Sequence, residues 1–345
     1  MRVTIRDVAK ECGVSPSTVS RVFNNKEGVS SETAENVLAV ADRLGYEPRS
    51  YNKSEKNTNY QENIVILFNN QFSGEDFTLN PFYGNIIEGI EGFLNENNYN
   101  LFLKGLTGDK KIDLLTIDDF INDEKIAGLL LIGSGIDKEI ILRIKDSETP
   151  VILVDNELLH ENIDCVVNDN QSGARMIMKH LIDLGHRRIA FIGGPLNNIP
   201  FDERYVTYKQ ALKKAGIEKN DDWIKFCGHS IKPEYGYQIA KKILNNNEMP
   251  TAIFAAADTL AMGVIRAAHE LGYSLPEDIS IAGFDDINIS AHIFPALTTI
   301  KVFKREMGIE AARRLLQLID DTSLKPIKIV VSVELLVRES TTKIK

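Results

Sequence analysis

The chain has 345 residues, of which 43% are hydrophobic, and a formal net charge of −9. This length allows a large hydrophobic core and more than one domain. With this negative charge, most of the protein surface repels nucleic acid. Any affinity for DNA therefore has to be concentrated in one part of the chain.

The cysteines and the absence of long apolar runs indicate the compartment. Cys12, Cys165 and Cys227 lie far apart and form no metal-binding spacing, which is typical of a reducing compartment. No apolar run approaches the roughly 20 residues that a membrane helix needs. The N-terminus shows no signal-peptide pattern. We therefore expect a cytoplasmic protein without a membrane partner.

The first fifty residues predict two short helices joined by a glycine turn. Ile5, Val8 and Ala9 recur at helical spacing, and Gly13 supplies the backbone freedom of the turn. An N-cap serine followed by proline is typical of a helix start, so a second helix begins after Ser15. Its inner face is closed by Val14, Val19 and Val22.

The outer face of this second helix carries short polar groups and one guanidinium, which suits insertion into the major groove of DNA. We expect Ser17 and Arg21 to contact base edges and Pro16 to pack on a thymine methyl group. Phosphate contacts are expected from Thr4, Ser15, Thr18, Ser20, Asn24, Ser30 and Thr33.

A third amphipathic helix begins at Ser30 or Ser31 and stops at Gly45. The plain alternative for residues 1–48 is a three-helix packing module that does not touch DNA, because short amphipathic helices are common. Residues 49–62 follow and contain no aliphatic side chain, which predicts a linker. The core therefore begins at residue 63.

Beyond the linker, short apolar strands alternate with amphipathic helices. This alternation is typical of parallel sheets covered on both faces, so the core belongs to the α/β class. Strands are expected at residues 64–68, 100–104, 126–132, 151–154, 188–192, 252–256 and 280–284. Helices are expected at residues 82–95, 171–184, 205–215, 235–245 and 260–271. Two halves of similar size, about 63–163 and 164–294, would place a ligand between them, beyond the carboxyl ends of the strands. In the tail, residues 306–319 predict a helix and residues 328–337 a strand.

Several motifs carry a resemblance to a known family. They are the run from Thr18 to Val22, Gly45 to Pro48, Asn80 to Tyr83, His180 to Ala190, Gly283 to Asp286, Leu297 to Ile300 and Val337 to Thr341. On these residues the chain resembles the lactose/galactose repressor (LacI/GalR) family over almost its whole length. The resemblance implies a small all-α helix-turn-helix head followed by a two-lobed core like that of periplasmic binding proteins. It also implies that the tail recrosses between the lobes, giving an N-subdomain of about 63–163 and 296–325 and a C-subdomain of about 164–294 and 327–342.

The resemblance also implies effector contacts at strand ends of both lobes. They map onto Phe82, Tyr83, Asp155, Arg204 and Asp285, with Ser134, Asn70, Asp169 and Asp258 as weaker candidates. Carboxylates, a guanidinium and aromatic rings suit a hydroxyl-rich ligand such as a sugar. Taken singly, each residue has a plainer role: the aspartates as loop caps, the arginine as an ion-pair partner, and the aromatic pair as core.

Two departures from the family pattern stand out. The family's short hinge helix carries a leucine that wedges into the minor groove, whereas this chain has Glu55 at that position. An acid would face phosphate repulsion there, so residues 49–62 are a degenerate hinge. In the ligand site, a frequent aromatic is replaced by Ile231 and a frequent asparagine by Ala257.

We therefore expect a DNA-binding repressor of a carbohydrate operon that binds a pseudo-palindromic operator as a homodimer. A sugar or sugar phosphate in the cleft would control this repressor. The six histidines are scattered without a metal-binding spacing, so we expect no metal site. We also expect no cofactor and no catalytic residue. One alternative is control by a protein co-regulator that docks on the helix at residues 306–319. Another is a sugar-modifying enzyme with a DNA-binding head, which the missing acid/base pair disfavours.

Overall fold

The computed structural model describes residues 5–23, 29–44, 46, 62–69, 80–133, 135–196, 198–228, 231–246 and 248–344. The chain divides into a small unit that includes the first 60 residues and a large unit that begins at Gln61. Predictions about residues 47–61, including Glu55, lie outside the described residues.

The small unit contains the three predicted helices, α1 (Ile5–Cys12), α2 (Pro16–Phe23) and α3 (Ser31–Leu44). Gly13 has a φ of +66°, a left-handed conformation that glycine adopts without strain. Val8, Val19 and Val37 are buried together and hold the helices to one another. Of the two predicted caps for α3, Ser30 is the one observed, because its Oγ accepts from the backbone N of Thr33 at 3.2 Å.

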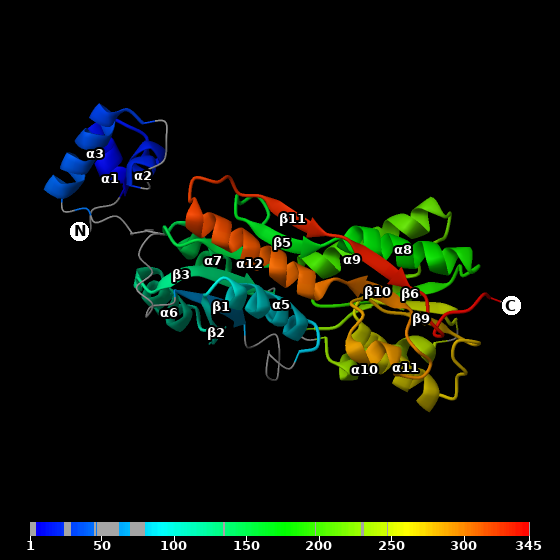
Figure 1. The fold of residues 1–345 in the computed structure, drawn as a ribbon. Coiled ribbons are helices and arrows are strands. Elements are labelled where there is room, and N and C mark those ends of the chain that lie inside the picture. The colour runs from blue at the N-terminus through cyan, green and yellow to red at the C-terminus, as the bar shows by residue number, and fades with distance from the viewer. Residues whose placement is uncertain are drawn as a thin grey trace. The chain divides into compact units, whose positions relative to one another are not determined.

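The first lobe of the large unit is a six-stranded parallel sheet (Figure 1). Its order is β11 (Lys328–Val331), β5 (Cys165–Asn168), β4 (Val151–Val154), β3 (Ile126–Ile132), β1 (Asn63–Asn69) and β2 (Asn100–Leu106). On β1, Ile64 and Ile66 pack in one apolar cluster, and Val65 and Leu67 pack in another on the opposite face. The first face is covered by α5 (Tyr83–Glu96) and α12 (Lys304–Asp320), and the second by α6 (Lys110–Asn122) and α7 (Lys138–Lys145).

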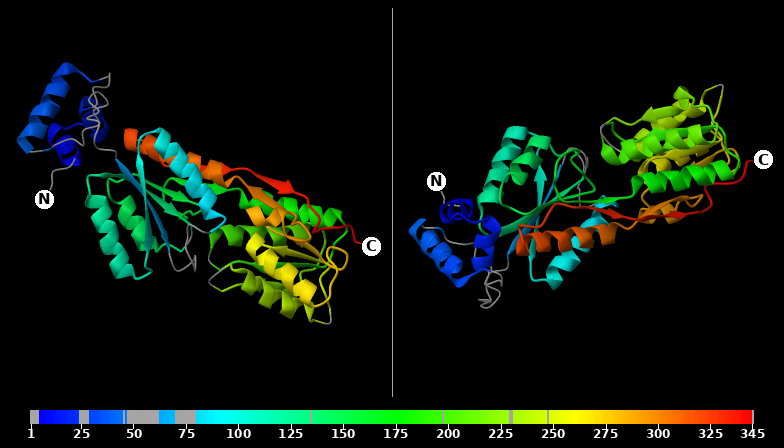
Figure 2. Two further views of the ribbon diagram at one scale, coloured as in Figure 1. Left: turned by 60° about the horizontal axis from the view of Figure 1, so that its bottom comes forward. Right: turned by 90° about the horizontal axis from the view of Figure 1, so that it is seen from above.

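The second lobe is a four-stranded parallel sheet of order β7 (Ile224–Phe226), β6 (Ile189–Gly193), β8 (Ala252–Ala255) and β9 (Ser280–Ala282). One face packs on α8 (Asn170–Asp183) and α9 (Ile199–Lys214), and the other on α10 (Pro233–Leu244) and α11 (Asp258–Glu270). Two short 3-10 helices, η2 (Asp221–Trp223) and η3 (Asn288–Ala291), complete this lobe. Both lobes therefore have the predicted α/β layering (Figure 2).

The connections between the lobes differ from the prediction in detail. The single strand predicted at residues 328–337 is two strands, since β11 pairs in parallel with β5 whereas β12 (Val333–Leu336) pairs antiparallel with β10 (Thr299–Val302). The predicted subdomain boundaries also differ from the sheet membership, because β5 and β11 lie in the first sheet. Asp285 bridges to Lys301 of β10, so residues predicted in the first lobe extend the second. None of the described helices is long and apolar enough to cross a membrane.

Two glycines of α5 allow a matched test of the contact with α12. A Cβ on Gly89 would lie 2.1 Å from the carbonyl oxygen of Arg305, whereas a Cβ on Gly92 would have its nearest neighbour at 3.8 Å. We expect Gly89→Ala to destabilise the core by about 1–3 kcal/mol through overpacking. Gly92→Ala should raise stability by about 0.5–1 kcal/mol, since alanine favours helix. Urea denaturation followed by circular dichroism measures both, and equal effects would contradict the packing argument.

Candidate functional site

The helix-turn-helix unit presents two similar helix starts. Ser15 Oγ lies 2.8 Å from Thr18 Oγ1 at the start of α2, and Ser30 Oγ lies 2.8 Å from Thr33 Oγ1 at the start of α3. Each serine also accepts from the backbone N of its threonine. Hydroxyls at a helix N-terminus, with its backbone N–H groups and dipole, suit contact with phosphate.

The structure places the remaining predicted DNA contacts only in part. Pro16 is exposed at the start of α2, and Ser17, Ser20 and Arg21 are positions on that helix. Thr4 and Asn24 lie outside the described residues.

In the core, Tyr83 and Asp155 come together from α5 and from the end of β4. The Tyr83 hydroxyl donates to Asp155 Oδ2 at 3.3 Å, and Asn168 Nδ2 donates to Asp155 Oδ1 at 3.2 Å. Asn80 Oδ1 accepts from the backbone N of Phe82 at 2.9 Å and so fixes the start of α5. Gly133 leaves room for the phenol, since a Cβ there would lie 2.9 Å from the Tyr83 oxygen.

Arg204 of α9 is held from several sides. Its Nε donates to Asn170 Oδ1 at 2.9 Å, and its Nη1 donates to the Ala256 carbonyl at 2.5 Å and to Asp285 Oδ1 at 3.3 Å. The guanidinium also lies 3.7 Å from the ring centroid of Phe284. The guanidinium is therefore fixed, with only 3% of the side chain exposed.

Asp285 follows β9 in a loop whose backbone is held by Lys304. The Lys304 ammonium donates to the carbonyls of Asp285 at 2.5 Å and Asp286 at 2.9 Å, and Arg338 pairs with Asp286 at 2.6 Å. Asp155, Asp285 and Asp286 all have positive φ angles, of 52°, 114° and 49°. Strained backbones of this kind gather at functional sites, where the surrounding contacts maintain them.

Tyr83, Asp155, Arg204 and Asp285, called the buried cluster below, influence one another electrostatically. Burial raises the pKa of Asp155 to about 7, while Arg204 opposes this rise and Asp285 adds to it. Burial also raises the pKa of Asp285 to about 6, against the effect of Arg204. The pKa of Tyr83 is raised by burial first and then by Asp155. Two carboxyls thus share one guanidinium in a poorly solvated place.

The other predicted effector residues have more ordinary surroundings. Phe82 is buried in the core and meets the Tyr83 ring edge-on at 5.2 Å. Asp169 caps α8 by accepting from the backbone N of Ser172 at 2.9 Å. The Asp258 carboxylate accepts from the backbone N of Ile287 and from the hydroxyls of Ser290 and Thr299, at 3.1, 2.6 and 2.5 Å. Asp169 and Asp258 therefore fit their structural roles, and Asn70 and Ser134 lie outside the described residues.

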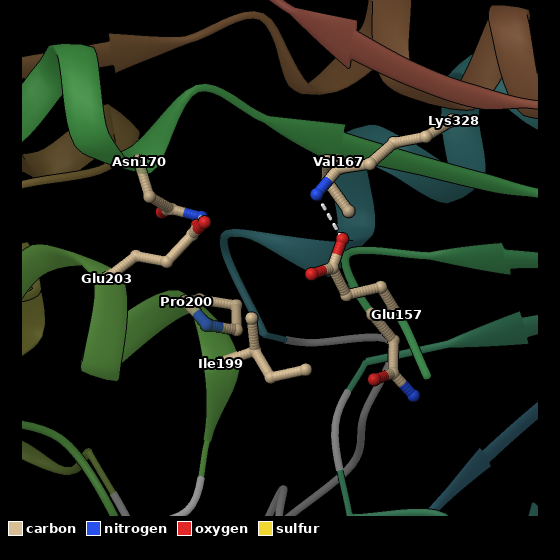
Figure 3. Close-up of a pocket in the computed structure, with 8 residues that line it drawn as sticks. Glu157, Val167, Asn170, Ile199, Pro200, Glu203 and Lys328 are labelled. Atoms are coloured by element: carbon tan, nitrogen blue, oxygen red, sulfur yellow. Dashed lines mark hydrogen bonds and ion pairs between the residues drawn. The ribbon is translucent and has the colours of Figure 1, made fainter. Parts of the chain in front are cut away.

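A small recess lies beside the buried cluster, between elements of both lobes (Figure 3). It is lined by Asn156, Glu157, Val167, Asn170, Ile199, Pro200, Glu203 and Lys328. In it, Lys328 pairs with Glu157, and Glu203 accepts from Asn170 Nδ2 at 3.1 Å. Asn170 thus connects the recess to Arg204.

Sequence reasoning missed several of these residues. Asn168 and Asn170 contact Asp155 and Arg204, and Lys304 holds the Asp285 loop. The only local signal was the polar run after the apolar residues of β5. Ile231 and Ala257, which replace frequent ligand-contacting residues of the family, pack with the apolar cluster of the second lobe.

Comparisons with known proteins agree with this arrangement. The profile of bacterial regulatory proteins of the lacI family matches residues 4–49, and that of a periplasmic binding protein-like domain matches residues 178–341. The HTH-type transcriptional repressor PurR of Histophilus somni (strain 129Pt) is 32% identical over 339 residues, which cover 98% of each chain.

Two solved structures are similar over nearly the whole length. A complex of the transcriptional regulator CelR with cellobiose has a TM-score of 0.74 at 27% identity and covers 98% of this chain and 100% of that one. The lac repressor dimer bound to operator and the anti-inducer ONPF has a TM-score of 0.71 at 26% identity and covers 99% and 100%. The fold and the helix-turn-helix unit thus define a DNA-binding transcriptional repressor regulated by a small effector. The chain belongs to the lacI family of bacterial regulatory proteins, which confirms the resemblance found in the sequence.

The raised pKa of Asp155 predicts how stability changes with pH. The native carboxyl keeps its proton to about pH 7, whereas the unfolded carboxyl loses it near its usual pKa of about 4. The contribution of Asp155 to the free energy of unfolding is therefore favourable at low pH and declines as pH rises from about 4 to about 7. We expect Asp155→Asn to melt at a higher temperature than the natural protein at about pH 8, with a smaller difference at about pH 5.

Asp119→Asn is the matched control, because Asp119 is an exposed aspartate on α6. Calorimetric melting at both pH values measures the difference for each variant. A pH-independent effect of Asp155→Asn would contradict the raised pKa.

Proposed function

We propose that this protein represses a carbohydrate operon by binding a pseudo-palindromic operator as a homodimer, with a sugar as effector. The observation that carries the effector part is the buried cluster, in which two carboxyls and a guanidinium from different strand ends meet. Carboxylates accept from hydroxyls and the guanidinium orients them, so the cluster suits a polyhydroxylated ligand. Operator DNA is cytoplasmic in bacteria, and we infer that the protein acts there.

The effector class has support from two directions. One similar solved structure is a complex with cellobiose, which favours a sugar. Because the curated relatives carry the name PurR rather than that of a sugar repressor, purine bases are the second effector class to test. Either ligand would lie between the two lobes and alter their relative position, so its differential affinity for two lobe arrangements would control operator binding.

For the DNA head, we propose that α2 enters the major groove and that the hydroxyl pairs of α2 and α3 contact phosphates. Ser15 with Thr18 and Ser30 with Thr33 occupy corresponding places at the two helix starts, which supports this division of roles. With residues 49–62 as a degenerate hinge, sequence discrimination would depend mainly on base contacts from Ser17 and Arg21.

Selection of operators from a random DNA pool tests the DNA-reading part. We expect Arg21→Ala to lose base preference at one position in each half-site and to lose about 1–3 kcal/mol of binding free energy on the selected operator. Arg43→Ala is the matched control, because Arg43 pairs with Glu11 at 2.8 Å on the exposed surface of the head. If Arg21→Ala selects the same operator with unchanged affinity, α2 is not the recognition helix.

For the homodimer, we propose that a second copy covers an apolar surface on the first lobe. Ile112 and Leu115 lie on α6, and Leu115 is 67% exposed. Phe102 of the edge strand β2 is exposed and pairs with Val65, whose side chain faces the layer of α6. These three side chains, the β2–α6 surface, form an exposed apolar area beside an unpaired sheet edge. A solved structure of similar fold is a dimer, which supports the presence of a second copy.

Light scattering after size exclusion tests this interface. We expect Leu115→Asp to shift the protein to monomers, because a second copy would have to bury the new carboxylate. Operator affinity should fall with it, since two linked heads bind with avidity. The control is Leu159→Asp, on another exposed leucine outside the β2–α6 surface. A dimer that persists in Leu115→Asp and operator affinity that does not change would move the interface elsewhere.

A further inference from the structure

Asp155 of the buried cluster has hydrogen-bond donors but no cation in contact with it. Among the described residues, its donors are neutral: the Tyr83 hydroxyl at 3.3 Å and the Asn168 amide at 3.2 Å. No described lysine, arginine or histidine forms an ion pair with it. A buried carboxylate without a cation is costly, so this arrangement is incomplete without a further partner.

Asn168 provides a second and independent observation. Its side chain is 2% exposed, and its Oδ1 has no hydrogen-bond partner among the described residues, while its Nδ2 is engaged with Asp155. Reversing the amide would bring Oδ1 against the carboxylate, so the orientation is fixed by Asp155. An orphaned buried acceptor next to a carboxylate without an ion-pair partner calls for a donor that the described residues do not supply.

The nearby cations are engaged in part. Lys304 is occupied by two backbone carbonyls, whereas Arg204 uses Nε and Nη1 for Asn170, the Ala256 carbonyl and Asp285 and makes no hydrogen bond from Nη2 within the described residues. Lys328 pairs with Glu157 in the adjoining recess. An anionic ligand group would therefore find two buried carboxyls and no uncommitted ammonium among these residues, which disfavours a phosphate.

We propose that the effector carries a protonated amine, which donates to Asp155 and to Asn168 Oδ1. The proposal rests on the small-effector site proposed above and narrows its ligand to an amine-bearing compound, with sugar phosphates excluded. Three ammonium donors match two carboxylate oxygens and the orphaned amide oxygen better than one hydroxyl does. The raised pKa of Asp155 agrees with this, since a cation beside the carboxyl would favour its ionised form.

The test uses the full chain and the operator selected above, with fluorescence anisotropy as the readout. The probes are D-glucosamine, D-galactosamine and D-mannosamine, each beside its parent hexose and the corresponding hexose phosphate, together with adenine and guanine. We expect at least one hexosamine to change operator affinity at a concentration about tenfold or more below that of its parent hexose. The proposal is overturned if no hexosamine acts, if the parent hexose is as effective, or if a phosphate or a purine base acts instead.

Two variants connect the preference to these residues. Asp155→Asn should reduce the preference for the hexosamine over its parent hexose to about twofold or less, whereas Asp119→Asn should retain it in full. Asn168→Ser, which removes the orphaned oxygen, should weaken the hexosamine response about tenfold and is the second, independent variant. A preference that survives in both variants overturns the proposal. Failure of the natural protein to bind the operator both without any compound and with each of them would instead overturn the proposed function.

Discussion

The hydrogen bonds and the ion pair of the Arg204 guanidinium are the interactions on which the geometry of the buried cluster depends most. This guanidinium joins four separate parts of the second lobe: α9, the start of α8, the end of β8 and the loop after β9. A buried guanidinium is stable only when it is paired and hydrogen-bonded, and here Asp285 supplies the opposite charge while Asn170 and the Ala256 carbonyl accept further hydrogen bonds. Removing Asp285 would leave the Arg204 charge buried without compensation, so the geometry of the cluster is set together.

The strained backbone after β9 has its own support, and this support comes from the other lobe. Lys304 begins α12, which packs on the first sheet, yet its ammonium holds the carbonyls of Asp285 and Asp286. On the opposite side, Asp258 connects α11 to Thr299 of the crossing strand β10. If the effector contacts Asp285, as proposed, it would act on groups that fix how the lobes meet, and its preference for one lobe arrangement would change operator affinity.

The sequence predicted the layers of the core better than its crossings. Continuous apolar runs such as Ile126–Ile132 can only be buried strands, and they appear as predicted. The run at residues 328–337 looks equally continuous, but its first half pairs with β5 and its second half with β10. Local periodicity does not reveal this difference, because the partner strands are distant in the sequence. Cys165–Asn168 was missed because only two of its four residues, Val166 and Val167, are aliphatic.

The candidate site shows the same division. Asp155, Arg204 and Asp285 follow from family motifs, and the structure brings them together. The role of Asn168 could not be predicted, because an unpaired amide oxygen is visible only when every neighbour is placed. Conversely, Asp258 follows a strand and so resembles a ligand-contacting residue in the sequence. In the structure, its carboxylate accepts hydrogen bonds from three donors of the protein itself. Position at a strand end thus identifies candidate ligand-binding residues. Their hydrogen bonds in the structure then distinguish the candidates whose polar atoms are satisfied by the protein from those whose polar atoms are not.

In the proposed homodimer, the charges of the head connect dimerisation with sensing. Residues 1–49 carry seven acidic and seven basic side chains, and Arg43 is engaged with Glu11, so one head offers little general attraction to phosphate. The contacts proposed for it are short hydroxyls at helix starts, whose strength depends on placement rather than on net charge. In the proposed homodimer, affinity for an operator would come from two such heads at the correct spacing, because linked weak contacts reinforce one another only when both can engage. Any movement of the lobes that changes this spacing removes that reinforcement, so a small effector can control DNA binding without touching DNA.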